Sequence, residues 1–389
     1  PPSRGGNPPP PMKGKPVEHE PYPVPIQRVQ AMPYGLKGFR AFCRILGLRL
    51  HPFQAFLLAF YFAGVTELVI LISKKNGKTT LLAALALYHL LMVKRAECVI
   101  GASSRDQATI LFNQAARLIS AAGLERHALP GDRREPTRYA GVFDVRHGYR
   151  LVQFEEGRIR VLAADADTAD GVIPTLALVD ELHRHPSGAL YGVFRDGLVG
   201  DAQMITISTA GAKSDSPLGE LLEKARAFAV EQVKRRATYT SPDGSFVLIE
   251  YALGSGDDPD DMRAVKTVNP APWHTLKSLK RRHDSPSTTR GQWLRFACGI
   301  WTEGEEPEIM PQEWDALRAD IGTLNPGDPV WLAPSVGDNA AIGVATVRDD
   351  EKVAVGAMVF EDEPGTSLLV RVEQACLALT EIYDVMGFC

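Results

Sequence analysis

The feature that constrains this chain most is a short apolar run, residues 68–72, that leads into a lysine-rich loop and then into an amphipathic helical stretch, residues 79–91. The loop reads Ser73-Lys74-Lys75-Asn76-Gly77-Lys78-Thr79-Thr80. When a buried strand ends in such a loop, the N–H groups and the dipole of the following helix are well placed to bind phosphate. The sequence therefore predicts a phosphate-binding loop over residues 73–80.

Individual residues of this loop have distinct predicted roles. Lys78 is expected to reach the β- and γ-phosphates of a nucleotide, and the hydroxyl of Thr79 is expected to hold Mg²⁺. Gly77 lets the backbone approach the ligand because it has no Cβ. The usual pattern GxxxxGK[ST] would place a glycine at position 72, where this chain has Ile72. The alternative is a basic helix start that faces solvent, but the position between strand and helix favours nucleotide binding.

Apolar runs and helical stretches alternate from about residue 36 to residue 226. The runs are residues 68–72, 98–102, 160–163, 175–179 and 204–208, and the helical stretches are residues 79–91, 105–122 and 217–228. Strands that alternate with helices predict a parallel α/β sheet with helices on both faces.

Two of these runs end in polar residues that suit a nucleotide site. Residues 175–179 lead into Asp180 and Glu181, and residues 204–208 lead into Thr209. Ligands of parallel sheets lie outside the carboxyl ends of the strands. Asp180 is therefore expected to hold Mg²⁺, Glu181 to orient or deprotonate the attacking water, and Thr209 to sense the γ-phosphate. The alternative is a pair of ordinary polar turns.

Composition sets the domain plan. A chain of 389 residues predicts two domains. The first 25 residues hold 10 of the 28 prolines, so residues 1–35 are expected to form an extended arm. Residues 36–228 form the predicted α/β domain, and residues 229–310 are expected to be mostly helical, with one strand at 247–251. Residues 311–389 show new strand signals at 330–333, 341–347 and 352–360 and a helical stretch at 367–383, which predict a second α/β domain.

Other sequence features exclude several classes of protein. A net charge of -4 argues against a uniformly basic surface, so contacts with nucleic acid would use local patches. Five scattered cysteines without a CxxC pair predict reduced thiols and no zinc site. Residues 53–72 approach the length of a membrane span, but Gln54 and Glu67 interrupt them, so a buried helix and a strand are expected.

In their order along the chain, these segments resemble the large terminase subunit of tailed bacteriophages. Residues 75–79 are similar to the divergent Walker A motif of that family, which also lacks the leading glycine, and Lys74 lies where many members carry arginine. Gln54 belongs to a segment that resembles the upstream glutamine motif that contacts adenine. Further similar segments are residues 102–108 after the second strand, 164–171 before Walker B, 178–183 at Walker B, 208–211 at the coupling motif, and 269–270 with 293–301 in the lid region.

The resemblance implies a P-loop ATPase with a lid subdomain over residues 229–310, followed by a ribonuclease H-like nuclease over residues 311–389. Its cofactors would be ATP and Mg²⁺, with Mn²⁺ possible at the nuclease. The ATPase would drive double-stranded DNA into a procapsid, and the nuclease would cut concatemeric DNA. The implied partners are the portal protein, the small terminase subunit and further copies in a pentameric ring. The implied location is the host cytoplasm, at the portal vertex of the procapsid and without membrane contact.

The nuclease region departs from the pattern of the family. Residues 330–333 look like its first strand, and Asp338 looks like its second acidic position, a metal ligand and catalytic residue. The aspartate expected directly after Ala333 is absent, and the chain ends at Cys389, about where a further strand and its aspartate are expected. Either residues are missing or the nuclease is degenerate, and we expect the former.

The sequence allows two interpretations of several charged residues. His183 and His185 follow Walker B and are expected to lie in a solvated loop, although they could touch nucleotide or DNA. A basic cluster could track DNA phosphates or be an ordinary solvated helix face: Lys277, Lys280, Arg281, Arg282 and His283. The candidates for an arginine finger that acts on a neighbouring copy are Arg105, Arg158, Arg160 and Arg195. The alternatives to a packaging motor are a helicase-like ATPase and a DNA-binding protein with a vestigial P-loop.

Overall fold

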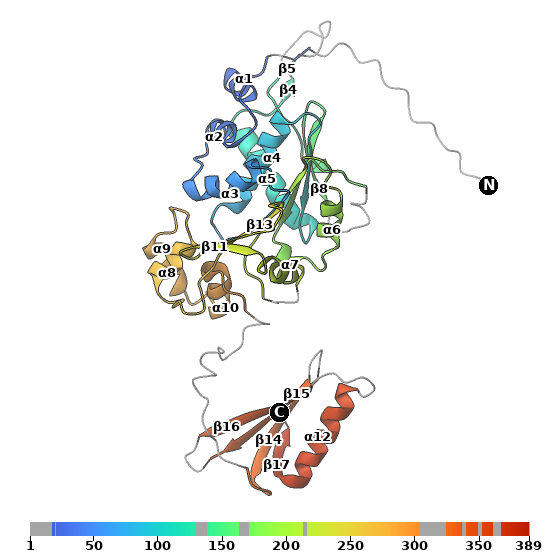
Figure 1. The fold of residues 1–389 in the computed structure, drawn as a ribbon, viewed down its shortest axis with the longest axis vertical. Helices are drawn as coiled ribbons and strands as arrows, with labels where there is room; N and C mark the ends of the chain where they lie inside the picture. Colours follow the sequence, from blue (N-terminus) through green and yellow to red (C-terminus); the bar gives the residue numbers. More distant parts are fainter. Residues whose placement is uncertain are drawn as a thin grey trace, which may run out of the picture. The chain divides into compact units, whose positions relative to one another are not determined.

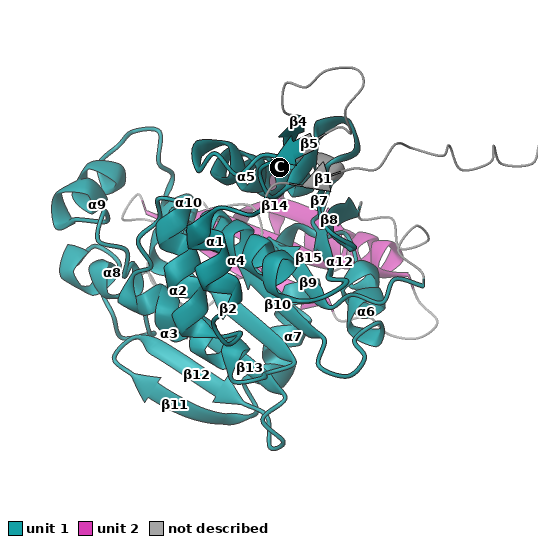
Figure 2. Ribbon diagram, turned by 90° about the horizontal axis from the view of Figure 1, so that it is seen from above, with its two compact units in different colours: residues 1–307 teal, residues 308–389 magenta. Residues whose placement is uncertain are grey.

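The structure is a computed structural model that describes residues 18–19, 21–128, 138–162, 171–212, 216–302, 324–336, 340–348, 352–360 and 367–388. The chain divides into two compact units, residues 1–307 and residues 308–389 (Figure 2). The first unit contains the predicted phosphate-binding loop, and the second contains the strands predicted beyond residue 311.

A ten-stranded sheet forms the centre of the first unit (Figure 1). Across the sheet the strands are β11 (Ala229–Val233), β12 (Arg236–Thr240), β13 (Phe246–Tyr251), β2 (Glu67–Leu71), β10 (Gln203–Ser208), β9 (Leu176–Asp180), β3 (Glu97–Gly101), β8 (Gly157–Leu162), β7 (Leu151–Phe154) and β6 (Asp144–Arg146). The strands from β13 to β8 pair in parallel, and antiparallel strands flank them at both ends. This arrangement confirms the predicted α/β fold with a parallel sheet.

Helices cover both faces of this sheet, as the alternation of residues in β2 shows. Leu68 and Ile70 belong to one apolar core, and Val69 and Leu71 belong to another. Successive side chains of a strand point to opposite faces, so the two cores lie on opposite sides of the sheet. The first core is built with α1 (Val24–Gln30), α2 (Leu36–Ile45), α3 (Pro52–Phe62), α4 (Lys78–Met92) and α5 (Arg105–Ala121), and the second with α6 (Ala189–Asp196) and α7 (Pro217–Ala225).

The apolar stretch at residues 53–72 divides as predicted into a helix, α3, and a strand, β2. No helix among the described residues is both long and apolar enough to cross a bilayer. A small separate sheet pairs β1 (Glu18–His19) with β5 (Arg138–Ala140), and β5 with β4 (His127–Ala128).

The segment after Ala229 is not mostly helical as expected, because β11 and β12 form a hairpin that extends the main sheet. Every residue of β11 is exposed, so this edge strand lacks the apolar alternation that identifies a half-buried strand. The helices of the predicted lid begin only afterwards, with α8 (Met262–Val268), α9 (Leu276–His283) and α10 (Arg290–Trp293). A π-helical turn, Leu294–Cys298, continues α10 directly.

The second unit is a four-stranded sheet with one described helix. In order across the sheet, the strands are β16 (Val353–Phe360), β15 (Ala340–Val347), β14 (Pro329–Val336) and β17 (Asp384–Phe388). Neighbours pair antiparallel except β14 and β17, which are parallel, and α12 (Leu368–Ile382) precedes β17. From the sequence, a further strand was expected only beyond Cys389, and β17, whose side chains are exposed or half-buried, was not predicted. Asp338 lies outside the described residues.

A buried histidine lies in the core beneath the sheet. His89 of α4 is 5% exposed, and its Nδ1 lies 2.8 Å from the Tyr34 hydroxyl and 3.0 Å from the Tyr61 hydroxyl. Its Nε2 lies 3.0 Å from Thr175 Oγ1. Burial lowers the pKa of His89 from 6.5 to about 4, because the charged imidazolium would lose its hydration.

This histidine predicts acid sensitivity of the first unit. Above about pH 6.5 His89 is neutral in both states, whereas between about pH 6.5 and 4 only the unfolded chain binds its proton. The free energy of unfolding should therefore fall as the pH drops through that window, by up to about 1.4 kcal/mol per pH unit from this residue. Urea unfolding from pH 7 to pH 4 should show a shallower pH dependence for His89→Gln than for the unmodified chain. Equal pH slopes for the two proteins would contradict this assignment.

Candidate active site

The loop between β2 and α4 has the backbone of a ligand-binding turn. Gly77 adopts φ 78° and ψ 24° at the N-terminus of α4, in the left-handed region that favours glycine. A Cβ on Gly77 would lie 3.3 Å from Gln54 Nε2 and 3.4 Å from the Trp273 ring. Lys75 is also left-handed, at φ 66°. The left-handed conformation at position 77 therefore favours glycine, and the two neighbouring side chains leave little room for a Cβ.

The structure brings the loop and the acidic strand end together. β10 pairs with β2 on one side and with β9 on the other, so the carboxyl ends of all three strands lie at one edge of the sheet. Lys78 Nζ lies 3.1 Å from Glu181 Oε1, and the Lys78 and Glu181 side chains are 8% and 18% exposed. Two residues more than a hundred positions apart in sequence thus form a largely buried ion pair.

Glu181 is held by more than Lys78. Thr209 Oγ1 donates to Glu181 Oε2 at 3.2 Å, and His183 Nδ1 lies 3.2 Å from the same oxygen. Burial alone would raise the pKa of Glu181, but the hydrogen bond from His183 and the charge of Lys78 outweigh it. The pKa of Glu181 therefore lies well below its usual range, and the side chain is a carboxylate at neutral pH.

The pKa of Asp180 is shifted in the opposite direction to that of Glu181. Burial and the neighbouring charge of Glu181 raise its pKa to about 6, and its Oδ1 is a buried oxygen without a hydrogen-bond partner among the described residues. Thr79, in the first turn of α4, is half-buried. An orphaned carboxylate oxygen and a hydroxyl are ligands that suit Mg²⁺, so the residues present fit this ion. No cluster of three or more His, Cys, Asp or Glu side chains suited to a metal occurs within the described ranges.

Residues of the lid fix the backbone of the loop. Asn76 Nδ2 donates to Ser73 O at 3.0 Å and to Asn269 Oδ1 at 3.3 Å. The backbone N–H of Ala271 donates to Asn76 Oδ1 at 3.2 Å. Asn269 is fully buried and also donates to the carbonyl of Ala297 at 2.7 Å. Asn76 is thus shared between the loop and the lid.

The lid makes four further contacts with the loop. The Trp273 indole donates to the carbonyl of Lys75 at 2.6 Å, and His274 Nε2 lies 3.1 Å from the same oxygen. The Lys74 N–H donates to the carbonyl of Phe296, in the π-helical turn, at 3.1 Å. Ser73 Oγ donates to the carbonyl of Ala297 at 3.0 Å. Each of residues 73–76 therefore contacts the lid directly.

Lys74 has an unusual environment for a lysine. Its Nζ lies 3.2 Å from the centre of the Phe296 ring, which is a cation–π contact. Burial, followed by the positive charge of Arg184, lowers the pKa of Lys74 to about 8. Arg184 also lowers the pKa of Asp180, and its side chain is exposed. Arg184 is therefore a cation beside the site, and it was not predicted from the sequence.

A cavity of about 270 Å³ lies between the start of α3, the first turns of α4 and the lid. Its lining includes Leu50, His51, Gln54, Thr80, Leu81 and Trp273. Gln54 Oε1 accepts the backbone N–H of His51 at 3.0 Å, which caps α3, while Gln54 Nε2 lies beside Gly77. The predicted adenine-contacting glutamine thus lines a cavity that adjoins the loop.

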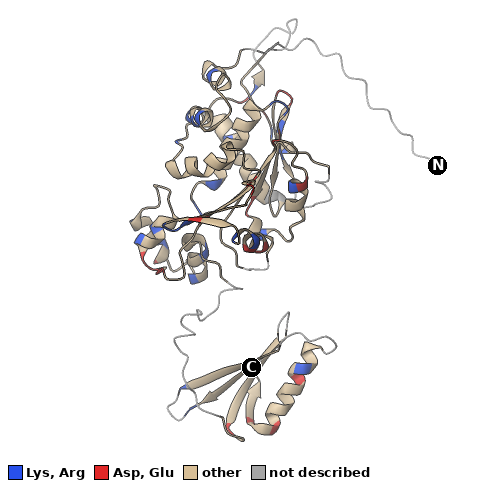
Figure 3. Cartoon of the chain, viewed as in Figure 1, with Lys and Arg blue, Asp and Glu red and all other residues tan. Residues whose placement is uncertain are grey.

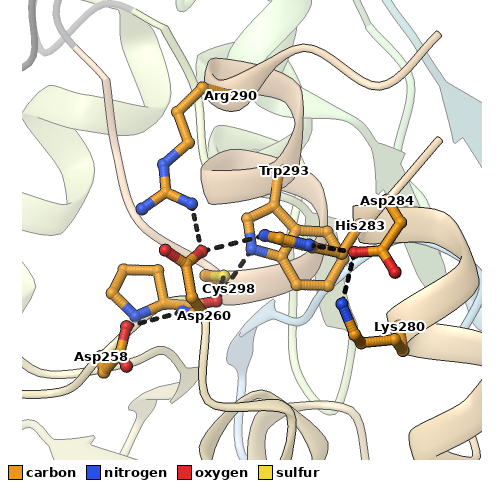
Figure 4. Close-up of polar contacts among 9 residues, drawn as sticks. Asp258, Asp260, Lys280, His283, Asp284, Arg290, Trp293 and Cys298 are labelled. Carbon is orange, nitrogen blue, oxygen red and sulfur yellow. Dashed lines mark hydrogen bonds and ion pairs between the residues drawn. The ribbon is translucent and has the colours of Figure 1, made fainter. Parts of the chain in front are cut away.

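The lid is braced by a polar network (Figure 4). Asp260 accepts from Arg290 and lies 3.0 Å from His283 Nε2, while His283 Nδ1 lies 2.9 Å from Asp284 Oδ1. The edge of the His283 ring meets Trp293 with the ring centres 4.9 Å apart. The Trp293 indole donates to the carbonyl of Pro259 at 2.9 Å. These contacts join α9 and α10 to the loop that precedes α8.

The same network accounts for part of the predicted basic cluster. Lys280 pairs with Asp284 at 2.7 Å, His283 lies between two carboxylates, and Arg282 donates to the carbonyl of Phe296 at 3.4 Å. Figure 3 shows Lys and Arg spread along the first unit with acidic residues among them. Within this cluster, three of the five residues are thus engaged in contacts inside the lid.

The histidines after Walker B are not in a solvated loop, so that expectation is wrong. The 3₁₀ turn η3 (Leu182–Arg184) winds back against β9 and β10, and only 7% of the His183 side chain is exposed. His185 is 4% exposed and its Nε2 lies 3.3 Å from the carbonyl of Asp180. Both rings are therefore part of the site rather than of a free loop.

Three candidate arginine fingers have partners in their own unit. Arg158 and Arg160 each lie 2.5 Å from a carboxylate oxygen of Glu97, and Arg195 lies 3.3 Å from Glu67. All three remain partly exposed, and surface ion pairs of this kind are weak enough to be exchanged. The side chain of Arg105 is outside the described part of the structure.

Comparison with known proteins gives one family. Residues 52–227 match the family described as the terminase large subunit, ATPase domain. A stretch of 141 residues is 33% identical to the large terminase subunit of Enterobacteria phage HK97 and covers 34% of this chain and 25% of that protein. The match thus spans about a quarter of the length of this relative.

Solved large terminases show a weaker likeness. The HK97 large terminase gives a TM-score of 0.49 at 19% identity, covering 87% of this chain and 70% of that one. The large terminase ATPase domain of Thermus phage P74-26 gives 0.42 at 17% identity, covering 66% of this chain and 97% of that one. With TM-scores below 0.5, these structures show only a general likeness, and the resemblance rests on the sequence matches and on the Walker-type site. Residues 52–227 thus match an ATPase domain of the terminase large subunit, and in that region the chain resembles the large terminase family.

Proposed function

We propose that this chain hydrolyses ATP to drive double-stranded DNA into a procapsid. The observation that carries the proposal is the buried pair of Lys78 and Glu181, which joins a phosphate-binding loop to a candidate general base. A lysine of the phosphate-binding loop and a carboxylate at the end of a nearby strand are parts that phosphoryl transfer uses.

The geometry supports one orientation of ATP. The phosphates would lie at the N-terminus of α4, where the loop N–H groups and Lys78 meet negative charge. Thr79 and Asp180 would hold Mg²⁺, which when bound supplies positive charge to the β- and γ-phosphates. The base would enter the cavity beside Gln54, with Trp273 as part of the cavity wall.

The chain's own residues account for the chemical step. Glu181 would accept a proton from the attacking water, whose oxygen forms a bond to the γ-phosphorus while the bond to the β–γ bridging oxygen breaks. Thr209 follows β10 and donates to Glu181, so it would couple the proton transfer at Glu181 to the end of this strand. ADP and phosphate are the products.

Assembly is the second part of the proposal. A pentameric ring at the portal vertex, with the portal protein and the small terminase subunit as partners in the host cytoplasm, would let one copy supply an arginine to the next. Arg105, Arg158, Arg160 and Arg195 remain candidates for that arginine. The partial exposure of Arg158, Arg160 and Arg195 supports such an exchange of partners.

A nuclease in the second unit is the third part of the proposal. Three antiparallel strands, a helix and then a strand beside the first support a ribonuclease H-like domain. Asp338 would be one of its metal-binding and catalytic carboxylates, with Mg²⁺ or Mn²⁺ as the ion. This domain would cut concatemeric DNA before and after packaging.

The first test separates chemistry from binding. Glu181→Gln should keep its affinity for ATP while turnover falls by about a hundredfold or more, because the amide cannot accept the proton. Lys78→Ala should instead weaken nucleotide binding, because it removes a charge that meets phosphate. Steady-state hydrolysis and binding of a fluorescent ATP analogue measure the two effects, with the exposed Glu223→Gln as the matched control. Unchanged turnover in Glu181→Gln would remove this residue from the role of general base.

The second test addresses the base cavity. Gln54→Glu keeps an oxygen to cap α3 but replaces the Nε2 donor, so it should raise the Kd for ATP by roughly tenfold. Inhibition by inorganic tripolyphosphate, which has no base, should change little. If ATP and tripolyphosphate weaken equally, the added charge acts on the phosphates, and Gln54 does not contact the base.

The third test concerns the second unit. With Mn²⁺ present, a chain that includes any residues missing around this unit should nick plasmid DNA, and Asp338→Ala should abolish nicking while ATP hydrolysis continues. Gel assays of supercoiled plasmid measure the cutting. Metal-dependent nicking that survives Asp338→Ala would refute the assignment of this aspartate.

A further inference from the structure

His183 is a buried side chain without a role in the function proposed so far. It lies in the middle of η3, which follows β9 in the chain and contacts β10, and its Nδ1 reaches two partners. Ser208 Oγ lies 2.9 Å from Nδ1, and Glu181 Oε2 lies 3.2 Å from it. One ring nitrogen therefore connects the candidate general base with the end of β10.

The partners of Nδ1 determine which of them is the donor. The Glu181 carboxylate can only accept, so Nδ1 must carry the hydrogen for this contact to be favourable. Ser208 Oγ is placed to donate to the carbonyl of Thr209 at 3.3 Å, which leaves its lone pairs to face the ring. His183 thus donates towards Glu181 and Ser208 from one N–H.

The two oxygens of Glu181 consequently have different partners. Oε2 receives hydrogen bonds from His183 and Thr209, which are both parts of the protein framework. Oε1 faces the Lys78 ammonium at 3.1 Å, and Lys78 is the residue that the γ-phosphate would attract. The partner of Oε1 is therefore the one that the charge of a γ-phosphate would attract.

The backbone of Glu181 makes this anchoring necessary. Glu181 adopts φ 51° and ψ 51°, a left-handed conformation that is unfavourable for a residue with a Cβ. A side chain that leaves a strand end in this conformation needs contacts beyond its own backbone to keep its direction. His183 and Thr209 provide such contacts from η3 and from the residue after β10.

We propose that His183 is a positioning residue that fixes Oε2 of Glu181, so that ATP hydrolysis requires only an exchange of partners at Oε1. In the structure Oε1 is paired with Lys78, so the general base faces a cation at this oxygen. When the γ-phosphate draws Lys78 away, Oε1 faces the attacking water and accepts its proton. This inference rests on the ATPase function proposed above.

Two substitutions of His183 test the inference against a purely structural role. His183→Leu removes the N–H and should lower kcat by about 10- to 100-fold, with KM and the Kd for an ATP analogue within about twofold of the unmodified chain. His183→Asn offers an amide N–H from a similar position and should recover most of the lost kcat. The matched control is His147→Leu, because His147 is an exposed histidine in another 3₁₀ turn, His147–Tyr149.

The outcomes separate this inference from the function on which it rests. If the unmodified chain does not hydrolyse ATP in a procapsid-stimulated assay, the proposed function fails. If Glu181→Gln is inactive but His183→Leu turns over normally, the function stands and the positioning role is overturned. A His183→Leu protein whose KM and Kd worsen in step with kcat, or an Asn variant no better than Leu, would also overturn it. Should His183→Leu fail to fold, the kcat of His183→Asn relative to Glu181→Gln decides: turnover as low as that of Glu181→Gln would overturn the role.

Discussion

The register of three parallel strands is the constraint on which the site depends. Ser208 of β10 pairs with Leu71 of β2, and Ile207 pairs with Asp180 of β9, so the three strand ends finish at nearly the same level. The residues that follow them, the loop, Glu181 and Thr209, must then share one edge of the sheet. Burying Lys78 and Glu181 there costs hydration energy, which their mutual attraction and the bonds from His183 and Thr209 offset. Either charge would be unfavourable there without a partner, and a triphosphate would be a partner able to replace Glu181 at Lys78.

The lid contacts this edge of the sheet through the phosphate-binding loop. Asn269, Trp273 and Phe296 each contact the backbone or a side chain of residues 73–76. The network around Asp260 and His283 joins the lid helices to one another. A displacement of the loop by nucleotide would therefore act on a braced subdomain rather than on a single side chain. The π-helical turn that carries Phe296 fits this position, because such turns are frequent at functional sites.

The sequence predicted those parts of the molecule whose signals are local. Runs such as residues 68–72 are apolar and β-branched because the central strands are buried on both faces, and the strand–loop–helix pattern locates the loop around Gly77. β11 and β17 were missed because their residues are exposed or half-buried and show no clear apolar pattern. Trp273 could not be assigned because its partner, Lys75, is 198 residues away. His183 was misjudged because a polar 3₁₀ turn looks like a surface loop until the neighbouring strand is placed.

The charges that surround the loop explain why the site should favour a polyanion. Lys74, Lys78 and Arg184 gather near two carboxylates, and the repulsion among the cations contributes to the lowered pKa of Lys74. Asp180 is disfavoured in its charged form by burial and by Glu181. A triphosphate beside Lys74 would stabilise it as a cation, and a divalent ion beside Asp180 would stabilise it as a carboxylate. Titratable groups whose pKa values are shifted in opposite directions within one site are typical of functional sites.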